Sequence, residues 1–352
     1  MQVVYSDEQL QEYMREAISI SEGSQVLVER FLEGATEVDI DVISDGTTTI
    51  VGGILEHIEG VGIHSGDSMC SFPPHSLSQS LQDELKEISS KIASTLGVIG
   101  LMNIQVAIYN GEIYVIEVNP RASRTIPFIS KCLGHSLAGI ATKAMLGISF
   151  KEQGVQPFAS PSYHAVKVPV FPFDKFLSSD IILGPEMRST GEVMGIGATF
   201  GEAMYKGFLG VHTRVIGPSA DKPYLFFSIG DKSQRKRIAE LARFFIEQSF
   251  SILATQGTAT LLEEEGIPVE RVHKVSEGRP NIIDYIKNKQ IVLVVNIIGG
   301  EHGASKDAMI LRRNALQEKI PCILTMEAAE AFIKAWQYRD STGVSHLREL
   351  YV

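Results

Sequence analysis

Cysteine is scarce in this sequence of 352 residues, which contains three: Cys70, Cys132 and Cys322. An odd number at wide spacing predicts neither a disulfide framework nor a zinc site, and it favours a reducing cytoplasm as the location. Cys70 and Cys132 are expected to be buried small residues, because no base and orienting group are evident beside either. Apolar runs of membrane-spanning length are also missing, so we expect no membrane contact.

Positive charge is in the minority. Lys and Arg total 32 against 42 Asp and Glu, which gives a formal net charge of −10. This balance argues against nucleic acid or an anionic membrane as a partner. It does not exclude phosphate binding, because a local group of backbone N–H groups can hold an anion whatever the global charge. Hydrophobic residues make up 44% and charged residues 21%, which is typical of a folded chain, and the length suggests two domains.

The first part of the sequence predicts a mixed α+β domain. It begins like the middle of a domain, with a polar and periodic start that is no signal peptide. A turn at Asp45-Gly46 predicts a hairpin, and residues 59–75, rich in Gly, Ser, Pro and His, predict a long loop. Strands are expected at 26–32, 37–46 and 47–58 and in a hairpin over 101–119, helices at 6–20, 78–96 and 134–147, and the closing edge of the domain at 148–217.

From about residue 217 the sequence alternates between strands and helices. This alternation predicts an α/β domain with a doubly wound parallel sheet. The expected strands are 223–229, 250–255, 291–298 and 321–325, and the expected helices are 232–248, 258–265, 305–318 and 327–337. The chain is therefore divided into domains at 1–216 and 217–352.

The segment 101–124 carries the most informative pattern. Glu117 and Asn119 are two residues apart, so they share one face of a strand. A three-residue loop at 109–111, with Gly111 in the left-handed conformation, would bring Gln105 of the partner strand to that face. This register separates a polar face from an apolar one. The polar face holds Asn103, Gln105, Glu117 and Asn119, and the apolar face holds Ile104, Val106, Ile108, Tyr114, Ile116 and Val118.

An oxygen-rich face of this kind suits a hard cation such as Mg²⁺ or Mn²⁺ that bridges nucleotide phosphates. Arg121 and Arg124 follow immediately, and guanidinium groups beside such a site suit a phosphoryl group in transfer. A solvated polar sheet face with an ordinary ion pair remains the alternative.

The C-terminal part carries features of an anion site. Residues 254–258 close a strand and open a helix with Thr255 and Thr258, and Lys232 and Lys274 follow other strands. Backbone N–H groups at a helix start can bind phosphate, and ligands of such sheets bind beyond the carboxyl ends of strands. Ordinary helix capping by Thr and Gly is the alternative.

The sequence resembles the C-terminal part of a carbamoyl-phosphate synthase large subunit. The strings that carry the resemblance are VLVERFLEGATEVDIDV, GGILEHIEGVGIHSGDS, GLMNIQVAIYNGEIYVIEVNPRASRT and LGPEMRSTGEVMGIG. They are more similar to the second ATP-grasp copy, which phosphorylates carbamate, than to the first. The resemblance implies an ATP-grasp domain followed by a methylglyoxal-synthase-like allosteric domain. It also implies the binding of ATP, Mg²⁺ or Mn²⁺ and carbamate, and the formation of carbamoyl phosphate for pyrimidine and arginine biosynthesis.

The resemblance also implies roles for individual residues of the first domain. Metals and phosphates would be held by Gln105, Glu117 and Asn119, and the transferred phosphoryl group would meet Asn119, Arg121 and Arg124. The nucleotide would be bound by Glu29, Arg30 and Leu32 at the adenine, by Glu37 at the ribose, and by His64 and Ser65 in a nearby loop. From the residues alone, Glu37 and Asp39 could equally face solvent, and His64 could be a surface histidine.

In the second domain, five residues match positions that bind effectors of the UMP or IMP type. They are Lys232, Thr255, Thr258, Lys274 and Asn296. One departure stands out, because the bacterial pattern Asn-Thr-Thr is replaced here by Asn296-Ile297-Ile298. The loss of two hydroxyl groups puts the identity of the effector in doubt.

The family pattern contains a Gly-rich phosphate loop before the segment that matches Met1. We therefore expect a fragment in which the ATP-grasp domain is truncated at its N-terminus. The glutamine amidotransferase small subunit would bind mainly through the missing part of the large subunit. Two alternatives are kept. One is a regulatory module that binds nucleotides without catalysis, and the other is a biotin-carboxylase-like ligase. The ligase is disfavoured by the C-terminal domain and by the string LGPEMRSTGEVMG.

Overall fold

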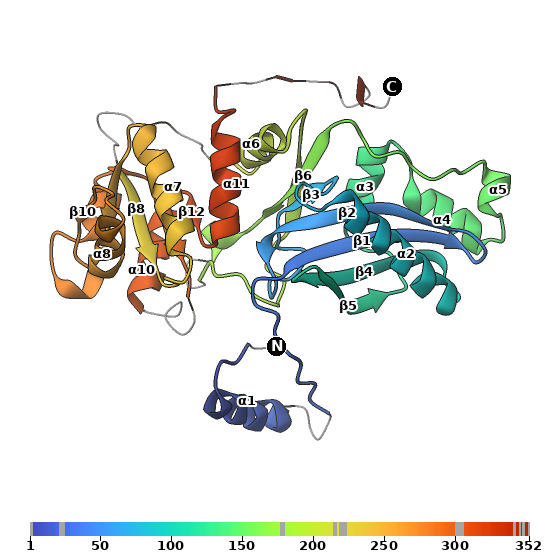
Figure 1. Cartoon of the computed structure of the whole chain (residues 1–352), viewed down its shortest axis with the longest axis horizontal. Helices are drawn as coiled ribbons and strands as arrows, with labels where there is room; N and C mark the ends of the chain where they lie inside the picture. Colours follow the sequence, from blue (N-terminus) through green and yellow to red (C-terminus); the bar gives the residue numbers. More distant parts are fainter. Residues whose placement is uncertain are drawn as a thin grey trace.

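The structure, a computed structural model, describes residues 3–20, 25–176, 180–213, 217, 224–299, 306–340, 343–344, 346 and 349–350. Its described strands form one antiparallel and one parallel sheet, and Figure 1 shows the two side by side, with α6 and α11 between them. The predicted pairing of an α+β domain with an α/β domain is confirmed. The predicted boundary between residues 216 and 217 falls where the structure describes residue 217 and none of its near neighbours, so it stays a prediction.

The described strands of the first domain form an antiparallel sheet in the order β5-β4-β1-β2-β3-β6-β7. The strands are β1 (Thr36–Asp45), β2 (Thr49–Gly60), β3 (Cys70–Phe72), β4 (Ile99–Tyr109), β5 (Glu112–Asn119), β6 (His164–Val170) and β7 (Gly191–Gly197). The helices are α2 (Gln79–Thr95), α3 (Ile126–Leu133), α4 (Leu137–Met145), α5 (Phe150–Gln153) and α6 (Phe200–Gly210), with a 3₁₀ turn at Phe173–Lys175.

Strand β1 explains how this sheet is covered. Its even residues Val38, Ile40 and Val42 are buried in one cluster with α2. The odd residues point to the opposite face. There Ile43 packs with α3 and α4, whereas the first half of the same face carries carboxylates. The sheet is thus apolar on one side and half polar on the other, and the polar half is the candidate site.

Two expectations for this domain were wrong. Residues 26–32 form no strand and run as an irregular, mostly exposed segment. The expected loop 59–75 contains the short strand β3, which bridges β2 and β6. The helix expected at 134–147 is confirmed as α4, whereas α3, a helix of eight residues just before it, was not predicted.

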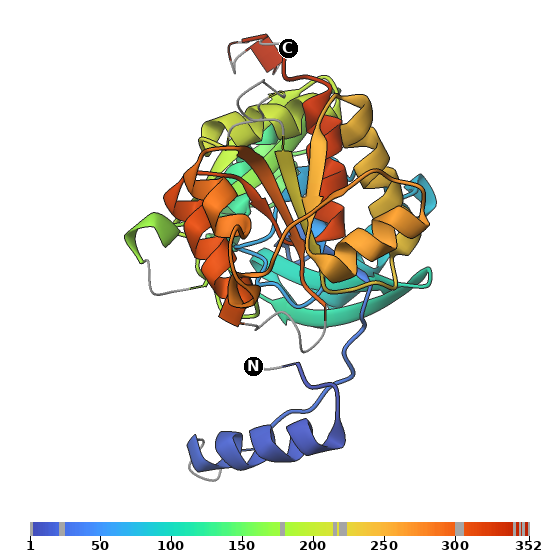
Figure 2. The ribbon, with the colours of Figure 1, turned by 90° about the vertical axis from the view of Figure 1, so that its left-hand side faces the viewer.

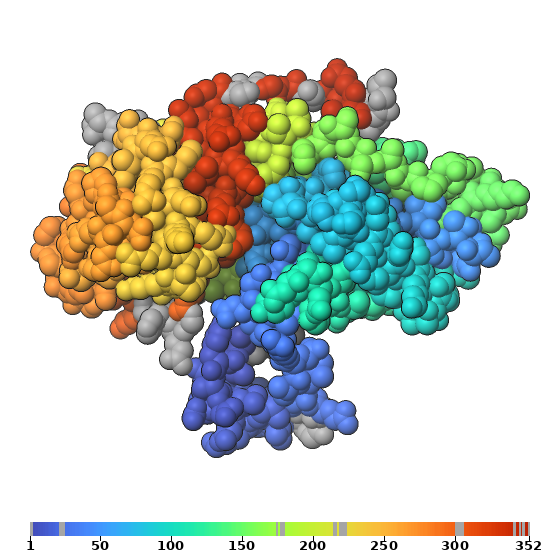
Figure 3. Space-filling model, in the orientation of Figure 1, coloured from blue at the N-terminus to red at the C-terminus, as the bar shows by residue number. Residues whose placement is uncertain are grey.

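Helix α1 (Asp7–Ile20) confirms the helix expected at 6–20. Within these residues, all of which the structure describes, no side chain is buried. Figures 1 and 3 show the helix standing off from the rest of the molecule. Its apolar face, which includes Ile18 and Ile20 at 52% and 73% exposure, therefore contributes little to the core.

The second domain has a parallel sheet in the order β10-β9-β8-β11-β12. The elements are β8 (Tyr224–Ile229), α7 (Arg235–Glu247), β9 (Ser251–Ala254), α8 (Gln256–Glu264), β10 (Glu270–Arg271), α9 (Ile282–Lys287), β11 (Ile291–Ile297), α10 (Lys306–Gln317), β12 (Cys322–Ile323) and α11 (Met326–Trp336). One face packs on α7, α8 and α11 and the other on α9 and α10, and Figure 2 shows helices on both sides of the sheet. The doubly wound sheet is confirmed, while β10 and α9 were not predicted.

The two domains share one hydrophobic core. Ile58 of β2, Met69, and Val168 of β6 belong to the same buried cluster as α6, α11 and the sheet of the second domain. Burial of each such side chain stabilises by roughly 1.5–3 kcal/mol. Strands β2 and β6 therefore turn one face to the second domain and the other to the polar half of the first sheet.

Candidate functional site

The register of three neighbouring strands builds a polar surface. Asp39 of β1 pairs with Gln105 of β4, and Asp41 pairs with Asn103. On the other side of β4, Gln105 pairs with Glu117 of β5 and Asn103 pairs with Asn119. Directly paired residues lie on the same face of a sheet. The predicted common face of Asn103, Gln105, Glu117 and Asn119 is confirmed, and it continues onto β1.

The turn of this hairpin differs from the expected one. Asn110 and Gly111 both have positive φ, 53° and 81°, and Tyr109 pairs with Glu112. This is a two-residue turn of the kind that Asn-Gly favours, because both residues tolerate that conformation. The one-residue shift comes instead from a bulge in β5, opposite Gln105 and Val106.

The bulge changes which side chains are buried. Tyr114 and Ile116, expected on the apolar face, are 39% and 48% exposed. Ile113, which was not expected there, packs on the apolar cluster, as does Val118, which was. The predicted three-residue loop was wrong. The predicted bulge exists, but it lies farther along β5, and it still places Gln105 opposite Glu117.

Strand β1 supplies three buried carboxylates to the polar face. Glu37, Asp39 and Asp41 are 6%, 2% and 0% exposed. The alternative that Glu37 and Asp39 face solvent is therefore wrong. Burial raises the pKa of Glu37, and the nearby His57 partly offsets this. Carboxylates are rarely buried without partners, so their partners define the site.

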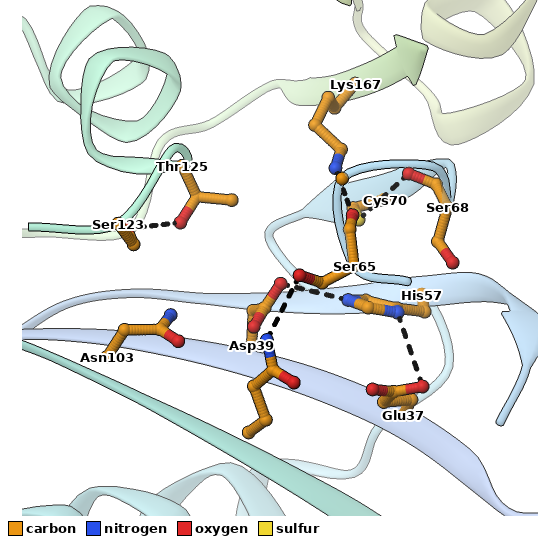
Figure 4. Close-up of polar contacts among 12 residues, drawn as sticks. Glu37, Asp39, His57, Ser65, Ser68, Cys70, Asn103, Ser123, Thr125 and Lys167 are labelled. Carbon is orange, nitrogen blue, oxygen red and sulfur yellow. Dashed lines mark hydrogen bonds and ion pairs between the residues drawn. The ribbon is translucent and has the colours of Figure 1, made fainter. Parts of the chain in front are cut away.

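His57 of β2 is the central partner. Its Nε2 lies 3.1 Å from Oδ2 of Asp39, and its Nδ1 lies 3.9 Å from a carboxylate oxygen of Glu37 (Figure 4). Burial alone would lower the pKa of His57, but the Cys70 sulfur and the Asp39 carboxylate raise it well above its usual range. Burial alone would raise the pKa of Asp39, but the hydrogen bond and charge of His57, together with Lys167 and Asn103, lower it. The two groups form a buried ion pair that the sequence analysis did not assign.

Asp41 fixes the loop that carries the candidate arginines. Its carboxylate accepts hydrogen bonds from Ser123 Oγ at 2.6 Å, from Asn103 Nδ2 at 3.0 Å, and from the Thr125 hydroxyl. Burial raises the pKa of Asp41 to about 6, although these hydrogen bonds oppose the rise. Arg121 lies two residues before Ser123, Arg124 lies between Ser123 and Thr125, and both arginines are exposed. Asp41 therefore positions both arginines without touching them.

A second loop, residues 61–69, closes over the polar face. Ser65 Oγ accepts from Gln105 Nε2 at 3.0 Å, and its carbonyl accepts from Lys167 Nζ at 2.7 Å (Figure 4). Lys167 is 1% exposed. Burial alone would lower the pKa of Lys167, but Cys70 and Asp39 raise it. This lysine is another site residue that the sequence analysis missed, since its neighbours in β6 are apolar.

The same loop meets the arginine segment at Gly66. A Cβ on Gly66 would lie 3.1 Å from Arg124 Nη1 and 3.2 Å from His64 Nδ1. His64 Nδ1 accepts the Gly66 N–H at 3.0 Å. The structure thus brings Arg124, His64 and Ser65 to one point above the strands.

The residues expected at the adenine lie in the irregular segment. Glu29 and Arg30 are exposed and Leu32 is half-buried. Phe31, between them, packs against the 61–69 loop, since a Cβ on Gly62 would lie 3.1 Å from its ring. This segment borders the site and does not enclose it.

Several groups at the site are suited to a ligand. The buried atoms Asp39 Oδ1 and His57 Nδ1 have no hydrogen-bond partner among the described residues. Asn119 Nδ2 donates to Glu117 Oε1 at 2.7 Å, and Arg121 Nη2 donates to Asn119 Oδ1 at 3.3 Å. In the part of the chain that the structure describes, no three His, Cys, Asp or Glu side chains cluster as metal ligands. The candidate ligands are one carboxylate and two amides, a set that fits a cation completed by phosphate oxygens and water.

The five expected effector residues lie around the carboxyl ends of the parallel strands. Lys232 Nζ reaches the first turn of α8, 3.4 Å from where a Gly257 Cβ would lie. Thr255 is the N-cap of α8 with its side chain uncommitted to capping, whereas Thr258 Oγ1 accepts the Ile229 N–H at 3.0 Å. Lys274 is exposed and 3.8 Å from Glu277.

Asn296 is already bound on both sides of its amide. Its Nδ2 donates to the Ser228 carbonyl at 3.1 Å, and its Oδ1 accepts from Arg312 Nη1 at 2.8 Å. Ile297, one of the two departures from the bacterial pattern, is 4% exposed and packs in the shared core. Its side chain therefore points away from the strand ends.

Two protein families match this sequence. Residues 1–153 match the family described as carbamoyl-phosphate synthase L chain, ATP binding domain, and residues 237–324 match the MGS-like domain. The carbamoyl phosphate synthase large chain of Neisseria meningitidis serogroup A is 48% identical over 351 residues, which are 100% of this chain and 32% of that protein. The large chain of Pasteurella multocida gives the same identity and coverage. The chain spans about a third of the relatives that it matches.

Solved structures show a more distant likeness. The biotin carboxylase domain of a single-chain bacterial carboxylase is 15% identical, with a TM-score of 0.42 over 58% of this chain and 57% of that one. Biotin carboxylase from Campylobacter jejuni is 17% identical, with a TM-score of 0.41 over 49% of this chain and 39% of that one. Among the described helices, none combines the length and apolar character needed to cross a bilayer.

Proposed function

The chain belongs to the carbamoyl phosphate synthase large-chain family, and from this premise we propose that its first domain takes part in the phosphorylation of carbamate by ATP. The register that places Gln105 opposite Glu117 and Asn103 opposite Asn119, beside Arg121, carries the proposal. Phosphoryl transfer needs little covalent chemistry from a protein, and it depends on positioning and charge neutralisation. The polar face offers both.

Each residue has a physical role in this proposal. Glu117, Asn119 and Gln105 hold a divalent cation, Mg²⁺ or Mn²⁺, which when bound neutralises charge on the ATP phosphates. Arg121 and Arg124 face the transferred phosphoryl group, and Asn119 orients Arg121 through its side-chain oxygen. Asp41 and the hydroxyls of Ser123 and Thr125 hold the arginine segment in place.

The nucleotide would lie along the same edge. Glu37 receives the ribose hydroxyls, and the backbone of Glu29, Arg30 and Leu32 reads the adenine edge. His64 and Ser65 approach the phosphates from the 61–69 loop. Hydrogen bonds to Lys167 and Gln105 hold that loop over the polar face. A loop in this position would exclude water from the bound nucleotide.

The second domain is proposed to bind a regulatory nucleotide. Lys232, Thr255 and Thr258 surround the start of α8, where backbone N–H groups favour a phosphate. Lys274 adds positive charge at the same edge, and Asn296 would contact the rest of the ligand. The effector would be a nucleoside monophosphate of the UMP or IMP type.

The wider setting follows from the family. A glutamine amidotransferase small subunit would supply ammonia through the rest of the large chain, and carbamoyl phosphate would enter pyrimidine and arginine synthesis in the cytoplasm. A second candidate is nucleotide binding without catalysis. The exposure of Leu27 at 79%, in the segment expected at the adenine, favours it, because an open edge excludes water poorly.

The decisive experiment runs the proposed step backwards. The purified chain is mixed with MgADP and carbamoyl phosphate, and the ATP formed is measured by luminescence. Glu117→Gln is expected to lose this activity, whereas Glu112→Gln, an exposed carboxylate on the same strand, retains it. A folded chain that yields no ATP would overturn catalysis by this chain and leave the nucleotide-binding alternative.

A further inference from the structure

Arg312 of α10 is the largest fully buried side chain of the described residues, at 1% exposure. A buried guanidinium must be paired, since an isolated charge there is very costly. Its Nε donates to Asp180 Oδ1 at 2.7 Å, its Nη2 donates to Asp180 Oδ2, and its Nη1 donates to Asn296 Oδ1. The bidentate geometry is the strongest that Arg and a carboxylate form.

Asp180 belongs to the first domain, so this ion pair joins the domains. Burial alone would raise the pKa of Asp180, but the hydrogen bonds and charge of Arg312 lower it, and the pair is ionised at neutral pH. Asp180 lies at the start of residues 180–189, which we name the strap. The strap is irregular, so it depends on side-chain contacts for its shape.

The strap is bonded to the 61–69 loop along its length. His64 N donates to the Gly184 carbonyl at 2.8 Å, and Ser189 Oγ donates to the Gly66 carbonyl at 3.0 Å. The backbone N–H groups of Arg188 and Ser189 both donate to the Asp67 carboxylate at 2.8 Å.

Arg188 also closes the strap on itself, because its Nη1 donates to the Asp180 carbonyl at 2.8 Å. A continuous series of bonds therefore runs from Asn296 and Arg312 through Asp180 and the strap to the loop of the candidate site. The last link of the series is Ser65, which accepts from Gln105.

We propose that Arg312 and Asp180 are a positioning pair through which the second domain holds the 61–69 loop in its place over the polar face. The pair does not touch the reacting groups. Its effect on the reaction rests on the proposed function, while its effect on the loop does not.

Hydrogen exchange measured peptide by peptide tests the proposal without requiring activity. Arg312→Gln and Asp180→Asn are each expected to speed exchange about tenfold in the loop and strap, with α2 and α4 unchanged. Tyr205→Phe is the matched control, because it removes another bond between distant segments, from Tyr205 Oη to the Arg339 carbonyl at 2.8 Å. It should leave the loop unaffected.

The outcomes separate clearly. Faster exchange confined to α10 and β11 would overturn the proposal. If Arg312→Gln speeds exchange in every peptide, the test rests on Asp180→Asn, which keeps the shape of the side chain. Faster exchange in every peptide of Asp180→Asn would also overturn the proposal. Where the chain makes ATP from MgADP, both variants should raise the KM for MgADP about fivefold with a smaller change in kcat. If the unmodified chain makes no ATP but the variants show the expected exchange pattern, the proposed function is refuted, whereas the role of Arg312 and Asp180 in positioning the loop is supported.

Discussion

Nε2 of His57 lies 3.1 Å from Oδ2 of Asp39, and each of the two residues is 2% exposed. They come from adjacent antiparallel strands near the irregular end of the β1–β2 pairing. Their pKa shifts run in opposite directions, upward for His57 and downward for Asp39. The polar face therefore contains a charged pair in addition to neutral hydrogen bonds such as that from Gln105 to Ser65.

Removing one charge of this pair should be costly. Asp39→Asn keeps the shape of the side chain but leaves the His57 cation without its bonded carboxylate. We expect the free energy of unfolding in urea to fall by about 3 kcal/mol. The pKa of His57, followed by NMR, should fall as well. Asp83→Asn, which breaks an exposed pair with Lys86, should cost no more than about 1 kcal/mol, and equal effects of the two variants would argue against a charged pair.

Glu59 should make the stability depend on pH. Burial raises its pKa to about 7 from 4.5 in the unfolded chain. Between these values the folded state binds more protons, so the stabilising contribution is complete below pH 4.5 and is lost as the pH rises through 7.

Glu59→Gln removes this titration and can still accept the Met69 N–H. It should be neutral at pH 4.5 and stabilise the fold by up to roughly 3 kcal/mol at pH 8 in urea unfolding. Glu87→Gln, on the exposed side of α2, should have the same free energy of unfolding as the parent chain at both pH 4.5 and pH 8. A gain at low pH would contradict the assignment.

The bulge in β5 predicts unequal costs for two isoleucines. Ile104 is 0% exposed and Ile116 is 48% exposed. Ile104→Ala should lower the free energy of unfolding by about 2–5 kcal/mol, whereas Ile116→Ala should change it by less than about 0.5 kcal/mol. Comparable losses at both positions would mean that Ile116 lies on the buried apolar face, as expected for a three-residue loop at 109–111.

A methyl group at Gly66 should disturb the site more than the fold. In Gly66→Ala the new Cβ meets Arg124 Nη1, His64 Nδ1 and Met187 Sδ at 3.1–3.2 Å. All three are ends of flexible side chains, so they can move, but Arg124 and His64 would then leave their positions. We expect ATP formation from MgADP and carbamoyl phosphate to fall about tenfold or more, while the melting temperature changes little.

The matched variant for this experiment is Gly60→Ala at the end of β2, where a Cβ meets nothing within 4 Å. It should leave both activity and melting temperature near those of the parent chain. If Gly66→Ala also kept full activity, Arg124 and His64 would not need their observed positions.

Hydrophobic periodicity and composition were sufficient to predict the helices and strands that are buried on one side. The helices α2, α7, α10 and α11 and the strands β1, β8 and β11 lie within a few residues of their expected bounds, because one-sided burial imposes the period on the sequence. The pairing of Gln105 with Glu117 was also predictable, since both strands carry alternating polar and apolar residues. The elements that were not predicted, β3, α3 and α9, have 3, 8 and 6 residues, which is too short for a period to be recognised.

The position of the bulge and the partners of buried charges were not predictable. Whether a hairpin gains its extra residue at the turn or within the strand depends on which edge side chains the core can cover, as the exposed Ile116 shows. The bonded partners of His57, Lys167 and Arg312 are 18, 102 and 132 residues away along the chain, so no local pattern identifies them.

The sequence by itself determined the two domain types, the family and the polar face of the β4–β5 hairpin, because these depend on local period and on short motifs. Tertiary structure alone decided which charges meet. An ion pair such as Arg312 with Asp180 exists because two distant segments exclude water together, and the free energy of a buried charge depends on that exclusion and not on its neighbours along the chain.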